Sequence, residues 1–205
     1  MNKETEYETV ELPKMEVQES AEEYVADQLF TYEDYCTWGG VDRWELIDGR
    51  AIKMEAPNRQ HQEISGHLFV ELYLYLKDKS CKVYAAPFDV RLNVGEGKDT
   101  VVQPDLVVFC DHTKLDYKGA KGSPDLLIEI LPPSNKKKNR IEKLQKYEQY
   151  RVKEVWLIDP LYKTVTAYLL DPKGEYVYRI YENDDSITSA VLADFTIGLE
   201  TIFAE

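Results

Sequence analysis

Apolar residues recur every four positions between residues 60 and 77, where Ile64, Leu68, Leu72 and Leu76 are each one helical turn apart. This spacing predicts an amphipathic helix with one buried face. A second helix is predicted over residues 139–150, with Ile141 and Leu144 on its buried side.

Shorter apolar runs between the two helices predict strands. The first run, residues 81–94, reads as one strand that bends at Pro87, and two more strands are predicted over residues 100–111 and 125–131. A fourth strand is predicted over residues 154–159, where Pro160 ends it. The order is therefore helix, three strands, helix, strand.

Hairpins are predicted at both ends of this core. Residues 43–54 form two short apolar runs around Asp48-Gly49, a favoured dipeptide for a tight turn. Residues 166–181 form a second pair of runs with a turn sequence between them. The pattern predicts an α/β or α+β fold, with a mixed sheet flanked by helices.

Charge divides the chain into two parts. The net charge is −13, and residues 1–28 contribute about half of it with nine acidic residues and two lysines. This segment has few large apolar residues, so we expect a flexible acidic arm followed by a single domain over residues 29–205. The arm could be a tail, a charge-based regulator or a partner contact. The acidic total argues against nucleic-acid binding by bulk electrostatics, so any such binding needs local positive charge.

The cysteines and the N-terminus predict a compartment. Cys36, Cys81 and Cys110 are odd in number, far apart and in no CxxC spacing, which predicts neither a disulfide framework nor a zinc site. A reducing, intracellular setting follows from that expectation. No apolar run approaches the ~18 residues of a membrane span, and the N-terminus is too acidic for a signal peptide. We expect a cytoplasmic protein with no membrane partner.

Two acidic residues interrupt apolar strands. Asp105 opens "DLVVF" and Glu129 lies in the middle of "LLIEIL". If the two strands are neighbours, both carboxylates can point to one face and hold Mg²⁺ or Mn²⁺, which could activate water against a phosphodiester. Asp125 competes for this role, but at about 13 Å from Glu129 along one strand it is too far away to share a metal. A structural ion pair of Glu129 with Lys143 is the alternative.

The second helix supplies a cation for the same site. Lys143 lies at the edge of the buried side, and Tyr147 flanks it one turn later. We expect Lys143 to reach Glu129, where it could orient water or stabilise developing charge. The basic strip just before and at the start of this helix suits contact with a phosphate backbone, although a solvated charge run is the commoner meaning. Its residues are Lys136, Lys137, Lys138 and Arg140.

Two further residues are weaker candidates. His61 starts the first helix, where a solvent-facing or capping role is as plausible as a catalytic one. Glu45 alternates with Trp44 and Leu46, so it points to the opposite face from them. It would be a third acid if its hairpin folds over the site. No glycine-rich phosphate loop and no G-x-S-x-G motif occurs, so neither an organic cofactor nor serine-triad chemistry is expected.

The motifs that carry these residues resemble one family. They are "WELIDG", "HQEISGHL", "PFDVRL", "VVQPDLVVFCD", "GSPDLLIEILPPS" and "KLQKYEQYRVKEVWLIDP". As an ordered set over residues 29–203 they resemble the Uma-two family of restriction-endonuclease-like proteins, which are similar to the PD-(D/E)XK nucleases. One departure is Pro132-Pro133-Ser134, where the family commonly has Ser-Pro-Ser.

The resemblance implies a restriction-endonuclease-like core of order αβββαβ, Mg²⁺ as cofactor and phosphodiester hydrolysis as the reaction. It implies Asp105 and Glu129 as metal ligands, with the backbone carbonyl of Ile130 as an extra ligand. The usual lysine position holds Leu131, and Lys143 matches the lysine that replaces it from the following helix. Glu45 and His61 also fall at matching positions.

Three functions remain open. The first is an Mg²⁺-dependent endonuclease acting on DNA, expected by analogy to work as a homodimer. The second is a non-catalytic interaction or scaffold protein that retains the fold, in which Glu129 and Lys143 merely pair. The third is a metal-dependent phosphohydrolase for small molecules, which would show a closed pocket.

Overall fold

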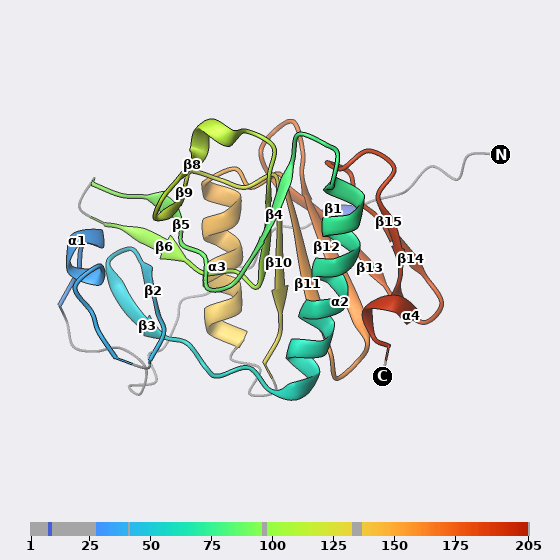
Figure 1. Cartoon of the computed structure of the whole chain (residues 1–205), viewed down its shortest axis with the longest axis horizontal. Helices are drawn as coiled ribbons and strands as arrows, with labels where there is room; N and C mark the ends of the chain where they lie inside the picture. Colours follow the sequence, from blue (N-terminus) through green and yellow to red (C-terminus); the bar gives the residue numbers. More distant parts are fainter. Residues whose placement is uncertain (1–7, 10–27, 41, 96–97, 133–136, 205) are drawn as a thin grey trace.

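The computed structural model describes residues 8–9, 28–40, 42–95, 98–132 and 137–204, and Figure 1 shows their arrangement. Within this part, a seven-stranded sheet has the order β1-β13-β12-β11-β10-β7-β4. Neighbouring strands are antiparallel except β10 and β11, which run parallel. The strands are β1 (Glu8–Thr9), β4 (Lys82–Ala85), β7 (Leu106–Phe109), β10 (Leu126–Ile130), β11 (Glu154–Asp159), β12 (Thr164–Leu170) and β13 (Tyr176–Tyr181).

The predicted core order is confirmed in this sheet. Helix α2 (Arg59–Leu76) precedes β4, β7 and β10, and helix α3 (Lys137–Gln149) connects β10 to β11. These four strands are neighbours in the sheet. The mixed α+β fold follows from the helical and alternating apolar periods along the chain.

The two helices lie on opposite faces of the sheet (Figure 1). One apolar core joins Ile64, Leu68, Leu72 and Leu76 of α2 to alternate residues of β10, Leu126, Ile128 and Ile130. The other core joins α3 to the intervening Leu127. Because strand side chains alternate between faces, Glu129 points with Leu127 toward α3. The alternation of β10 therefore aims an acidic side chain at this helix.

A six-stranded sheet with the order β3-β2-β6-β5-β9-β8 lies beside α3 (Figure 1). Its neighbours are antiparallel except β5 and β9. The strands are β2 (Trp44–Ile47), β3 (Arg50–Lys53), β5 (Val90–Asn93), β6 (Thr100–Val102), β8 (Leu115–Asp116) and β9 (Gly119–Lys121). The predicted hairpin around Asp48-Gly49 is confirmed as β2–β3, with both turn residues at positive φ.

The prediction of one strand over residues 81–94 and one over residues 100–111 is wrong, because each stretch forms two strands. The chain leaves the seven-stranded sheet after β4, passes Pro87 and enters the six-stranded sheet as β5. It returns between β6 and β7 at Gln103-Pro104. Proline has no backbone N–H to donate to a ladder, so each change of sheet occurs at or beside a proline.

Short elements complete the fold. The predicted terminal hairpin is confirmed as β12–β13. The remaining elements are α1 (Tyr32–Tyr35), the 3₁₀ helix η1 (His112–Lys114), the paired strands β14 (Ser186–Thr188) and β15 (Thr196–Gly198), and α4 (Leu199–Ile202). Most of the predicted acidic arm lies outside the described residues, but β1 within it pairs with β13.

The expectation about the cysteines is wrong. Cys81 and Cys110 form a disulfide, and Cys36 is free and exposed. The pairing of Lys82 with Phe109 in strands β4 and β7 places the two flanking cysteines opposite each other. The number of cysteines therefore no longer supports a reducing setting, and the compartment stays a prediction. None of the helices in the described part is long and apolar enough to cross a membrane.

Candidate active site

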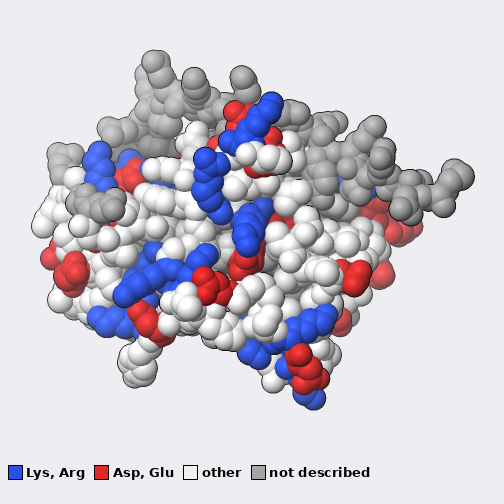
Figure 2. Space-filling model, turned by 90° about the horizontal axis from the view of Figure 1, so that it is seen from above, with Lys and Arg blue, Asp and Glu red and all other residues white. Residues whose placement is uncertain are grey.

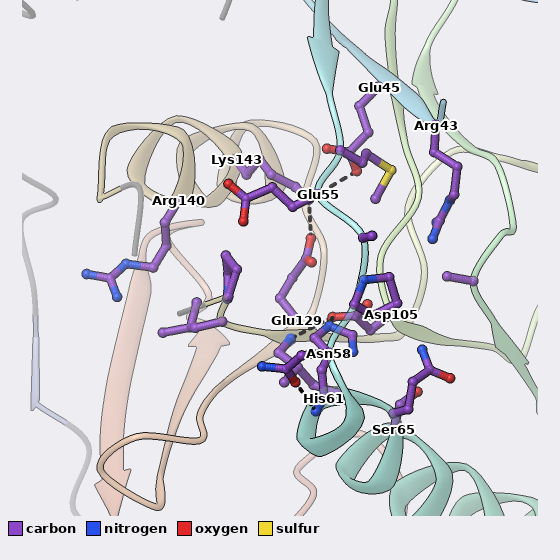
Figure 3. Close-up of a pocket in the computed structure, with 18 of the residues that line it drawn as sticks. Arg43, Glu45, Glu55, Asn58, His61, Ser65, Asp105, Glu129, Arg140 and Lys143 are labelled. Carbon is purple, nitrogen blue, oxygen red and sulfur yellow. Dashed lines mark hydrogen bonds and ion pairs between the residues drawn. The ribbon is translucent and has the colours of Figure 1, made fainter. Parts of the chain in front are cut away.

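A cavity of about 760 Å³ lies where the β2–β3 hairpin, the first turns of α2, the ends of β7 and β10, and α3 meet (Figure 3). Its wall includes the predicted residues Glu45, His61, Asp105, Glu129 and Lys143. These residues come from five separate stretches of the chain. The fold therefore brings the predicted candidates to one place.

Asp105 directly precedes β7, and Glu129 lies on β10, the antiparallel neighbour of β7. Ile128 of β10 pairs with Leu106, the first residue of β7, and the carboxylate of the preceding residue, Asp105, accepts from the backbone N–H of Ile130 at the end of β10. The prediction that both acids can hold one metal required the two strands to be neighbours, and β7 and β10 are neighbours.

Each of these two carboxylates makes its contacts with neighbouring side chains and backbone through one of its two oxygens. Asp105 Oδ2 accepts from the backbone N–H of Ile130 at 2.7 Å and lies 3.2 Å from Nε2 of His61. Glu129 Oε1 accepts from the Tyr147 hydroxyl at 2.5 Å and from Lys143 Nζ at 2.6 Å. Within the described part, Asp105 Oδ1 and Glu129 Oε2 have no such donor, which leaves one oxygen of each acid for a ligand in the cavity.

The electrostatics of the cavity favour a proton on Glu129. Burial raises the pKa of Glu129 to about 7, and the charges of Asp105 and Glu45 add to this effect against the opposing charge of Lys143. Burial alone would lower the pKa of Lys143, but Glu129 and Glu45 outweigh it and raise the pKa. Lys143 therefore stays an ammonium. Burial, followed by the charge of Glu129, raises the pKa of Tyr147 well above its ordinary value, so its hydroxyl keeps its proton.

Glu45 is buried and holds Lys143. Its Oε1 lies 3.0 Å from Lys143 Nζ and accepts from the backbone N–H of Gln103 at 2.8 Å. Glu45 is predicted to be a third acid of the site if its hairpin folds over it, and the β2–β3 hairpin does so. Two more ion pairs fasten the hairpin to α3, and they are Asp48 with Lys146 and Arg50 with Glu142.

His61 lies in the first turn of α2. Asn58 caps this helix by accepting from the backbone N–H of His61 at 2.8 Å. Burial would lower the pKa of His61, but the hydrogen bond and charge of Asp105 outweigh it, and the pKa is raised. The imidazole therefore contacts one acid of the pair and lines the cavity.

The predicted nucleic-acid strip is only partly described. Lys136 lies outside the described residues, and Lys137 and Lys138 belong to the first turn of α3 with side chains that are not described. Arg140 lines the cavity. On the face shown in Figure 2, basic side chains are interspersed with acidic ones, so positive charge for a phosphate has to be local.

Asp125, the competing acid, has structural partners. It lies 2.6 Å from Lys153 Nζ and accepts from the backbone N–H of Cys110 at 2.8 Å. It is not among the residues that line the cavity. Asp125 therefore joins the start of β10 to the residues beside β7 and β11.

Sequence reasoning missed Arg43, whose guanidinium points into the cavity (Figure 3). Its Nε donates to Oε1 of Gln103 at 2.9 Å. A lone arginine before a short strand carries no distinctive sequence signal. Its hydrogen-bond partner Gln103 is sixty residues away in the sequence.

The donor set suits a hard divalent cation, because two carboxylates each keep one oxygen available and Mg²⁺ prefers oxygen ligands. Three or more His, Cys, Asp or Glu residues at metal-binding distance do not occur in the described residues. A cation here would thus need backbone carbonyl, water or substrate oxygens beside Asp105 and Glu129. The backbone of Ile130, which also lines the cavity, is the predicted source of one.

Comparison with known proteins agrees with this picture. The profile of the Uma2 family, described as "Putative restriction endonuclease", matches residues 31–200. The chain belongs to the Uma2 family. A crystal structure described as "a putative nuclease belonging to DUF820 from Anabaena variabilis" matches with a TM-score of 0.70 and 18% identity, covering 85% of this chain and 98% of that chain. At this identity the match shows a shared fold. Among proteins of curated function, none matches the sequence.

Within the Uma2 match, the motifs that suggested the family carry Glu45, His61, Asp105, Glu129 and Lys143. All five also line the cavity. The family resemblance and the geometry thus concern the same residues, although neither assigns a chemical role to any of them.

Proposed function

We propose that this Uma2 protein is a metal-dependent endonuclease that hydrolyses phosphodiester bonds of DNA. The observation that carries the proposal is the arrangement of Asp105 and Glu129. Asp105 directly precedes β7 and Glu129 lies on the neighbouring strand β10, each with one oxygen available, and Lys143 contacts Glu129 in the same cavity. Membership of a restriction-endonuclease family supports the same reaction class.

Asp105, Glu129 and the Ile130 carbonyl would hold Mg²⁺ or Mn²⁺. When bound, such a cation would lower the pKa of a water ligand and neutralise charge on the phosphate. The raised pKa of Glu129 means that a cation competes with a proton for its carboxylate. We therefore expect metal binding to strengthen as the pH rises through about 7.

The protein's own residues would orient the acids and stabilise charge. Tyr147 donates to Glu129 and fixes the carboxylate, and His61 does the same for Asp105. Lys143 remains an ammonium, so it can donate to a phosphate oxygen as negative charge develops. Glu45 keeps Lys143 in place as a positioning residue.

Nicking of supercoiled plasmid tests the proposal. The wild type should nick in Mg²⁺ or Mn²⁺ and stop on addition of EDTA, and Asp105→Asn and Glu129→Gln should each lower the rate by at least about 100-fold. Asp125→Asn is the matched control, because it alters an acid of the same strand region outside the cavity, and it should nick at the wild-type rate. A folded wild type that nicks in neither metal would refute the proposal.

The second candidate is a scaffold protein that retains the nuclease fold. It is favoured by the contacts of Lys143 with both Glu129 and Glu45, which already satisfy much of the buried charge. In that case Lys143→Met would lower stability while no variant showed a metal-dependent reaction. A small-molecule phosphohydrolase would instead act on a phosphate monoester such as p-nitrophenyl phosphate and leave plasmid intact.

We also propose that the protein acts as a homodimer. The reason is an analogy, since nucleases of this fold often dimerise to cut both strands of DNA. Multi-angle light scattering of the purified chain should give twice the mass of 23.8 kDa. A monomer at concentrations that support double-strand cleavage would contradict it.

A further inference from the structure

Arg43 lines the cavity, and one of its guanidinium nitrogens is buried without a hydrogen-bond partner. In the described part of the chain, Arg43 Nη2 and His61 Nδ1 are the buried side-chain nitrogen or oxygen atoms that lack a hydrogen bond. Both residues line the same cavity. Buried polar groups in native proteins are nearly always paired, so this donor is suited to an acceptor such as a water or a ligand oxygen.

The guanidinium of Arg43 is held in place through its Nε atom. Its Nε donates to Gln103 Oε1 at 2.9 Å. The amide of Gln103 in turn donates to Asp89 Oδ1 at 2.8 Å and to the Tyr35 hydroxyl at 2.9 Å. Tyr35 closes the network by donating to Asp89 at 2.9 Å. This network fixes the guanidinium before any ligand binds, which lowers the entropic cost of binding.

The charge of Arg43 is also uncompensated. No carboxylate of the described residues lies within ion-pair distance of Arg43, and the partner of its Nε is a neutral amide. Lys143, on the same cavity wall, contacts two carboxylates. Arg43 thus combines a fixed pose, an unused donor and a positive charge without a carboxylate partner, in the cavity that holds Asp105 and Glu129.

We propose that Arg43 binds a phosphate of the nucleic-acid backbone next to the phosphate that is cleaved, and so acts as a substrate-positioning residue. The proposal rests on the function proposed above. A guanidinium presents a planar fork of donors that matches two oxygens of a phosphate, and it keeps its charge at every working pH. Figure 3 shows Arg43 and Lys143 well apart in the cavity, so the two cations can serve different phosphates of one strand.

A phosphodiester fits this position better than a free carboxylate ligand would. Asp105 and Glu129 repel any anion unless a divalent cation or a second anchor offsets them, and a nucleic-acid strand supplies both a cleavable phosphate and a neighbouring one. Arg43 would hold the neighbouring phosphate and thereby set the register of the strand against Asp105 and Glu129.

The salt dependence of binding tests this assignment. DNA affinity is measured in Ca²⁺ over a range of salt concentrations for wild type, Arg43→Met, Arg43→Lys and the control Arg179→Met on the distant strand β13. Loss of one phosphate contact should weaken binding roughly 10-fold and lower the slope of log K against log salt by about 1. Arg43→Lys should keep the slope and lose part of the affinity, and Arg179→Met should match the wild type. An Arg43→Met variant with wild-type slope and affinity would overturn the assignment.

A second measurement uses the wild-type protein alone, so that it holds even if a variant fails to fold. Single neutral methylphosphonate linkages are placed one at a time along a DNA strand beside the cleavage position. One such substitution should raise KM roughly 10-fold with kcat little changed. Equal KM at every position would overturn the role of Arg43 while cleavage itself still supported the nuclease. A wild type that neither binds nor cuts DNA would instead refute the nuclease, and the assignment of Arg43 with it.

Discussion

Replacing Lys143 by Met tests the balance of charges in the cavity. The substitution removes the ammonium and keeps an apolar chain of similar length. Lys143 Nζ lies 2.6 Å from Glu129 Oε1 and 3.0 Å from Glu45 Oε1, and the three side chains are only 15%, 16% and 4% exposed. Removing one partner of a buried ion pair costs about 3–5 kcal/mol, because the other charge is left without compensation.

We expect a loss near the lower limit, about 3 kcal/mol, at pH 8. The pKa of Glu129 is already raised to about 7, so this carboxyl can take up a proton when the ammonium is gone. At pH 6 it is largely protonated in the wild type as well, and the loss should be smaller there.

Urea denaturation at both pH values measures this loss. Lys146→Met is the matched control on the same helix, since Lys146 contacts one carboxylate, Asp48, and should cost about 1 kcal/mol. The double variant Lys143→Met/Glu129→Gln should be more stable than the sum of the single losses predicts, by roughly 1–3 kcal/mol. Additive losses, or a Lys143→Met loss no greater than that of Lys146→Met, would refute the idea of a coupled buried cluster.

Three further predictions concern other groups. The pKa of Glu129 is raised from 4.5 to about 7, so the folded protein holds a proton there that the unfolded chain has released. Stability from this group is fully present below pH 4.5 and lost as the pH rises through about 7, by roughly 3 kcal/mol, and a Glu129→Gln variant should lack this part of the pH dependence in urea denaturation. Asp125→Asn loses its ion pair with Lys153 and should lower stability by about 1 kcal/mol, measured by thermal unfolding, with metal binding intact. Peptide mapping under non-reducing conditions should recover Cys81 joined to Cys110, and finding both as free thiols would contradict the structure.

The parts of the site that sequence could predict are those set by local periodicity. Alternation along β2 places Glu45 on the face opposite Trp44 and Leu46, and alternation along β10 isolates Glu129 among apolar residues. Helical spacing places Lys143 at the edge of the buried side of α3. These directions are fixed within a few residues of each side chain, so they can be read before the fold is known.

The parts that the sequence could not predict depend on how residues far apart in the sequence pair in the sheets. Residues 81–94 and 100–111 each read as one strand, because an apolar pattern does not reveal a change of sheet. The Cys81–Cys110 disulfide joins residues 29 positions apart, and it follows from the pairing of β4 with β7. The side chain of Arg43 is held in the site by Gln103, and no local pattern links these two residues.

Calorimetric titration of Mn²⁺ into the metal-free protein at pH 8 tests the central claim, that Asp105 and Glu129 hold a divalent cation together. The wild type and Asp125→Asn should bind Mn²⁺ at a saturable site, and Asp105→Asn and Glu129→Gln should each weaken that binding by at least about 10-fold. A wild type that binds no Mn²⁺, or acid variants that bind it as tightly as the wild type, would contradict the account.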